Sequence, residues 1–108
     1  EKAYPLFVEC MESGLYWAET GIITLIHIMI DLMDTNILSR HNFEILEYVK
    51  EYAKSVWKDY EINGVMKQET IGRMDQEFIN RNISPGGAAD NLAITMAIYL
   101  LERMDLEE

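Results

Sequence analysis

The chain has 108 residues, of which 49% are hydrophobic, and its formal net charge is −10. This length suits one domain, and so apolar a composition favours a folded globule over disorder. The negative charge argues against partners such as nucleic acid or anionic membranes, because both would be repelled. A single cysteine, Cys10, excludes an internal disulfide and fits a reducing, cytoplasmic location.

Hydrophobic spacing predicts an all-α fold, a compact bundle of about five helices that forms a single domain over residues 1–108. The expected helices cover residues 4–13, 16 or 20 to 33, 42–59, 67–80 and 84–104. The apolar run over residues 22–33 is shorter than the roughly 20 residues needed to span a bilayer. We therefore expect it to be a buried, central core helix.

The third and fifth helices differ in their apolar pattern. In the third, Leu46, Val49, Ala53 and Val56 recur at three- and four-residue steps, which predicts an amphipathic surface helix. The fifth, residues 84–104, carries apolar side chains nearly all round. We expect it to be buried, with Ser84 as its N-cap, Pro85 as its first residue and a frayed acidic tail after it.

The first group of polar residues that could have a catalytic or binding role lies directly after the second helix. Asp34 is expected near the C-terminus of that helix, where a carboxylate opposes the helix dipole at a cost of roughly 0.3–1 kcal/mol. One interpretation is that Asp34 and Asn36 shape a turn by bonding to the backbone. The other is that they join Arg40 at one mouth of the bundle, where Arg40 would bind a phosphate. His41 is either a surface residue or a flank of that site.

A second such segment opens the last helix. Gly86 and Gly87 stand in its first turn, where each costs about 1 kcal/mol relative to alanine. Two interpretations remain open: the glycines leave backbone N–H groups accessible to an anion, or they let two helices pack closely. Arg81 would add positive charge to an anion site. Asp90, one turn into the helix, would bind a metal ion, a ribose hydroxyl or an amine.

Taken in order, Asp34-Thr35-Asn36 with Arg40 and then residues 82–90 (Asn-Ile-Ser-Pro-Gly-Gly-Ala-Ala-Asp) resemble a known C-terminal signature. The signature is that of the triphosphoribosyl-dephospho-coenzyme A synthase family, which serves citrate lyase and malonate decarboxylase. The similarity covers about residues 14–101. It implies a transferase that joins the triphosphoribosyl group of ATP to dephospho-coenzyme A, releases adenine and makes a prosthetic-group precursor.

The resemblance also implies roles for particular residues. Asp34 and Asp90 would be catalytic and would bind Mg²⁺ that accompanies ATP. The residues expected to bind substrate phosphates are Asn36, Arg40, Arg81, Ser84, Gly86 and Gly87. This chain departs from the family pattern in three places: His41-Asn42 replaces a usual Gly-Gly, Ala88 a usual serine, and Asn91 a usual apolar residue.

The family's N-terminal motifs, a Lys-Pro-Gly and an Asn-Thr-His-Lys-Gly segment, are not present in this chain. We therefore expect the C-terminal part of a longer enzyme, inactive as a transferase by itself. Its partners would be ATP, dephospho-coenzyme A, the missing N-terminal half and further copies of itself. Two alternatives are a non-catalytic helical module that binds a phosphorylated ligand or a partner protein, and a purely structural piece.

Overall fold

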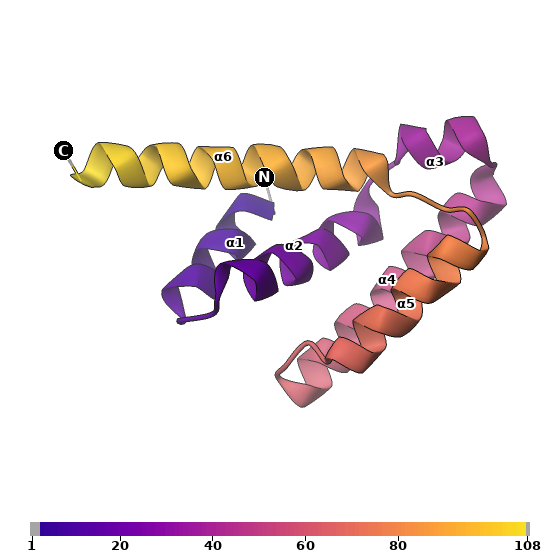
Figure 1. The fold of residues 1–108 in the computed structure, drawn as a ribbon, viewed down its shortest axis with the longest axis horizontal. Coiled ribbons are helices and arrows are strands. Elements are labelled where there is room, and N and C mark those ends of the chain that lie inside the picture. The colour runs from indigo at the N-terminus through magenta and orange to yellow at the C-terminus, as the bar shows by residue number, and fades with distance from the viewer. Residues whose placement is uncertain (1–2, 108) are drawn as a thin grey trace.

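The computed structural model describes the backbone of residues 3–107 and the side chains of residues 3–104. Within that range it is all helical, which confirms the predicted fold class (Figure 1). The six helices found there are α1 (Ala3–Glu12), α2 (Trp17–Asp31), α3 (Thr35–Arg40), α4 (Phe43–Asn63), α5 (Gln68–Asn80) and α6 (Gly86–Glu107). The helices α4 and α5 lie side by side, and α6 passes α1, α2 and α3.

The helix α2 forms the centre of the fold, as the sequence predicts. It packs against α1, α4 and α6, and Ile23 and Ile26 are almost completely shielded from solvent. The amphipathic prediction for α4 is also confirmed, because Leu46, Val49 and Ala53 are buried. Among the described residues, no helix is long and apolar enough to cross a membrane.

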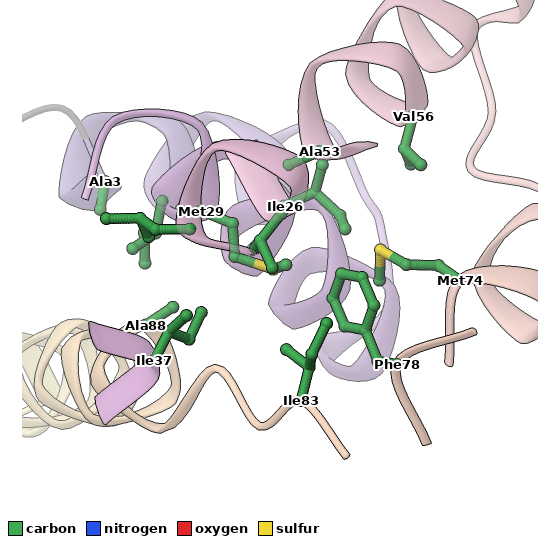
Figure 2. Close-up of a cluster of buried hydrophobic side chains, with 13 residues drawn as sticks. Ala3, Ile26, Met29, Ile37, Ala53, Val56, Met74, Phe78, Ile83 and Ala88 are labelled. Atoms are coloured by element: carbon green, nitrogen blue, oxygen red, sulfur yellow. The ribbon is translucent and has the colours of Figure 1, made fainter. Parts of the chain in front are cut away.

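Side chains from distant parts of the chain complete this core. Figure 2 shows Met74 and Phe78 of α5 in the same cluster as Ile26 of α2. Ile83, in the connector between α5 and α6, belongs to it as well. Burying Ile83 fixes the path of the connector, and that path sets the position at which α6 begins.

The prediction that the last helix is buried is wrong. Ala88, Thr95 and Tyr99 are buried, but Ile94 and Leu101 are 62% and 61% exposed. Figure 1 shows the C-terminal half of α6 projecting past α1. The position at the centre is taken by α2, so within the described part of the chain α6 has neighbours on one side only. The helix also continues to Glu107 where fraying was expected.

Aromatic side chains hold the contacting side of α6 in place. The Phe7 ring lies 5.2 Å from the Trp17 ring and 5.3 Å from the Tyr99 ring, both in edge-on arrangements. Such pairs stabilise by about 0.5–1.5 kcal/mol beyond the area they bury. Residues of α1, α2 and α6 therefore meet in one aromatic cluster.

Candidate functional site

Asp34 is the residue around which the candidate site is built. It is 3% exposed, and its Oδ1 accepts hydrogen bonds from the backbone nitrogens of Asn36 at 3.0 Å and Ile37 at 3.4 Å. The same oxygen accepts from Gly87 N at 3.2 Å, and Oδ2 accepts from Ala88 N at 3.1 Å. One carboxylate thus caps the N-termini of α3 and α6 together.

This geometry corrects the expected position of Asp34. The helix α2 ends at Asp31, and Leu32 is already extended, with φ −71° and ψ 131°. Asp34 therefore does not oppose the dipole of α2. It lies at the positive ends of two other helices, where a carboxylate stabilises by about 0.3–1 kcal/mol at each. The turn-shaping interpretation of Asp34 is confirmed.

The two glycines of α6 allow this close approach. A Cβ added at Gly87 would lie 2.7 Å from Asp34 Oδ1, well inside normal contact distance. A Cβ at Gly86 would collide with the side-chain amide of Asn36. Of the two interpretations of Gly86-Gly87, close packing is the one that the geometry supports.

Each N–H at the start of α6 has an acceptor inside the chain. Gly86 N donates to Ser84 O at 2.9 Å, and Ala89 N donates to Pro85 O at 3.0 Å. Asp34 accepts from the two nitrogens between them. The helix consequently begins at Gly86 with a cap supplied from another segment, and Ser84 is not its N-cap. The backbone cradle expected to be open to phosphate is filled by Asp34.

A second contact joins the two motif segments. His41, directly after α3, has its Nε2 2.9 Å from the carbonyl oxygen of Asn82. A carbonyl can only accept, so Nε2 carries the proton. Asn82 has φ 58°, and Ile83 N donates to Phe78 O at 2.8 Å, which is the hydrogen bond of a Schellman C-cap on α5. Through its contact with Asn82, His41 ties the end of α3 to this C-cap, and it therefore flanks the site.

Arg81 is held against α4. Its guanidinium carbon lies 4.3 Å from the centre of the Tyr48 ring, and its Nε lies 3.9 Å from Glu77 Oε1. The Tyr48 hydroxyl donates to the same Glu77 oxygen at 3.4 Å. Burial, and then the Glu77 carboxylate, raise the pKa of Tyr48, so this phenol stays a donor. The sequence pattern does not single out Tyr48, because its contacts with Arg81 and Glu77 join residues that are about 30 positions apart.

The remaining residues that the sequence predicts for the site are accessible to solvent. Asn36, Arg40, Arg81, Ser84 and Asp90 are all exposed. Arg40 directly precedes His41, and Arg81 directly precedes Asn82. The His41–Asn82 contact therefore brings the two arginine positions close together along the backbone. We call residues 34–41 with residues 81–90 the α3–α6 junction.

The junction offers few ligands for a metal ion. Among the residues that the structure describes, no three His, Cys, Asp or Glu side chains are grouped so as to hold one. Both oxygens of Asp34 already accept backbone hydrogen bonds. The exposed carboxylate of Asp90 can still serve a cation that arrives with a phosphate ligand, because Mg²⁺ commonly takes only one or two protein carboxylates beside phosphate and water.

Comparison with known proteins identifies the family. The sequence model of the ATP:dephospho-CoA triphosphoribosyl transferase family matches residues 1–108. The chain belongs to this family. It is 31% identical to the 2-(5''-triphosphoribosyl)-3'-dephosphocoenzyme-A synthase of Pectobacterium atrosepticum over 99 residues, which are 92% of this chain. It is 36% identical to a probable enzyme of the same name from Malonomonas rubra, also over 92% of this chain.

The match spans only part of those triphosphoribosyl transferases. The chain covers 31% of the length of both relatives. A probable synthase from Salmonella gallinarum is 43% identical over 76 residues, which are 67% of this chain and 24% of that protein. No solved structure matches the chain. The family membership confirms the resemblance stated from the two motifs and favours an enzyme over a non-catalytic module.

Proposed function

We propose that this chain is part of an enzyme that transfers the triphosphoribosyl group of ATP to dephospho-coenzyme A. In the reaction a ribose hydroxyl of dephospho-coenzyme A attacks the ribose C1 of ATP. The C1–N bond to adenine breaks, and the triphosphate remains on the transferred ribose. The product is the precursor of the prosthetic group of citrate lyase or malonate decarboxylase. The relatives named above carry the synthase name for this product.

One observation supports the proposal most directly: the two motif segments meet in space. Asp34 bonds to Gly87 and Ala88, which lie 53 and 54 residues away, and His41 bonds to Asn82, 41 residues away. Arg40 and Arg81 directly precede the two residues of the His41–Asn82 contact, and Asn36 and Ser84 are exposed residues of the same two segments. Guanidinium groups bind phosphate oxygens bidentately, as a triphosphate requires.

In this proposal Asp34 and Asp90 act differently. Asp34 is a positioning residue, because its carboxylate is buried and holds α6 against α3. Asp90 is exposed and free to contact Mg²⁺ or a ribose hydroxyl. Mg²⁺ would neutralise charge on the triphosphate when it is bound. The phosphate groups themselves would be held by Arg40, Arg81, Asn36 and Ser84.

We also propose that α6 is covered by protein in the working enzyme. Its exposed side carries Ile94, Ile98 and Leu101 at four- and three-residue steps, 41–62% exposed. A stripe of this kind suits a contact with the rest of the family's fold or with a second copy. The buried free thiol of Cys10 and the ATP substrate both suit the cytoplasm.

The test is release of adenine. The full gene product is incubated with ATP, Mg²⁺ and dephospho-coenzyme A, and adenine is separated by chromatography. We expect adenine only when both substrates are present, and we expect none from the 108-residue chain alone. Adenine release by the chain alone would disprove its dependence on further sequence. No release by the full gene product would disprove the proposed function.

A further inference from the structure

An apolar groove runs along one side of the molecule between α2 and α5. Its volume is about 730 Å³, within the range of roughly 300–1,000 Å³ typical of small-molecule sites. Ile22, Leu25 and Met29 of α2 form one wall, and Ile71, Gly72 and Ile79 of α5 form the other. The α5 wall extends from Gln68 to Ile79, which at 1.5 Å per residue is about 16 Å.

The groove ends at the α3–α6 junction. Ser84 and Pro85 line it, and they directly precede the glycines that pack on Asp34 and Asn36. A ligand whose phosphates lie at the junction would thus have the end of the groove within reach. Glu19 and Asp75 are the charged residues that line the groove, and both are exposed. Their carboxylates repel phosphate but accept hydrogen bonds from amide N–H groups.

Gly72 gives a second, independent indication that a ligand binds in this groove. It lies in the interior of α5, where glycine costs about 1 kcal/mol relative to alanine. A Cβ at this position would have no neighbour within 4 Å, so the packing of the described residues does not require glycine. The groove side of α5 is left bare at this point, which allows a ligand to approach the helix closely.

We propose that this groove binds the neutral pantetheine arm of dephospho-coenzyme A. The arm is elongated, mostly aliphatic and carries two amide groups, which suits an apolar channel with carboxylates at its edge. A purine ring suits it less, because Phe78 is the aromatic residue among those lining it and is only 5% exposed, too buried to offer a stacking face. The inference rests on the proposed function, since that function supplies the ligand.

The experiment fills the groove at Gly72. Gly72→Phe places a ring where the structure has open space, and Gln76→Phe, at an exposed position of the same helix that does not line the groove, is the matched control. In the full gene product we expect Gly72→Phe to raise KM for dephospho-coenzyme A about tenfold, equivalent to about 1.4 kcal/mol. KM for ATP should not change, and Gln76→Phe should leave both constants near the parent values. An unchanged KM for dephospho-coenzyme A in Gly72→Phe, or an equal rise for ATP, would overturn the inference.

A binding measurement separates this inference from the transferase activity. Pantetheine and, separately, adenosine are titrated into the 108-residue chain with isotope-labelled isoleucine methyl groups. Pantetheine should shift the signals of Ile22, Ile71 and Ile79, and the shifts should disappear in Gly72→Phe. Shifts with adenosine alone, or none with pantetheine, contradict the inference whatever the activity. Circular dichroism is the check that each variant is folded.

Discussion

Oδ1 of Asp34 lies 3.2 Å from the backbone nitrogen of Gly87, although 53 residues separate them in the chain. Through this bond and the one to Ala88, a loop carboxylate completes the first turn of the longest described helix. The contact links the two motifs that characterise the sequence.

Replacing Asp34 by alanine should destabilise the fold by about 2–3 kcal/mol. Two N-caps are lost at once, each about 1 kcal/mol, and buried N–H groups are left without an acceptor. Urea unfolding followed by circular dichroism measures the change. Asp90→Asn is the control, since Asp90 is exposed and should alter stability by less than about 0.5 kcal/mol. Equal stability of the two variants would show that the double cap contributes nothing.

Alanine at Gly87 and at Gly72 should have opposite effects. Both changes improve helix propensity, but the new Cβ at Gly87 would lie 2.7 Å from Asp34 Oδ1, while that at Gly72 meets nothing within 4 Å. We expect Gly72→Ala to stabilise by about 0.5–1 kcal/mol. Gly87→Ala should destabilise, because the cap must move. The measurement is the Tm of each variant in thermal unfolding, compared with that of the parent chain. A rise in Tm for Gly87→Ala would contradict the packing role of that glycine.

Thr24→Val should stabilise the chain. The hydroxyl oxygens of Thr20 and Thr24 are buried in α2 without a hydrogen-bond partner among the described residues. Valine has a similar shape and removes a polar group that has lost its hydration, so a gain of about 1 kcal/mol is expected. The free energy of unfolding in urea is the measurement. Thr24→Ser, which retains the hydroxyl and loses a methyl group, should instead be less stable than the parent.

Arg81→Ala should weaken binding of the triphosphate. Loss of a charge-assisted hydrogen bond costs about 1.5–3 kcal/mol, which corresponds to a rise in KM for ATP of about tenfold or more in the full gene product. Arg81→Lys should recover only part of this loss, because lysine cannot bind bidentately. Arg73→Ala is the matched control, since Arg73 is exposed on α5 and lines a separate polar groove with Asp59 and Glu69. Equal effects at the two arginines would exclude a specific role for Arg81.

Stability should decline at alkaline pH partly through Cys10. Burial, and then the nearby Glu9 carboxylate, raise the pKa of the Cys10 thiol above its unfolded value of about 8.5. A raised pKa in the folded state stabilises the fold below the unfolded pKa, and this contribution is lost as pH rises through the folded pKa. Cys10→Ala should therefore lose less stability than the parent between about pH 8 and pH 10. Identical pH profiles would show that the thiol does not contribute.

Most of the helices could be predicted from the residue pattern alone, because a helix is specified locally. The 3.6-residue spacing of Leu46, Val49, Ala53 and Val56 reveals α4, and the apolar run of α2 reveals the centre of the core. The short helix α3 was missed, since six residues carry little periodic pattern. The order of the two motifs also identified the family.

The contacts that those motifs make could be seen only in the folded chain. An N-cap supplied from 53 residues away leaves no mark in the local pattern, so Asp34 was expected at the wrong end of a helix, and the N–H groups after Gly86 were expected to be open. The burial of α6 was misjudged for a related reason. Apolar residues on two sides show that a helix can be covered, but only the packing of the other helices shows which side has a neighbour.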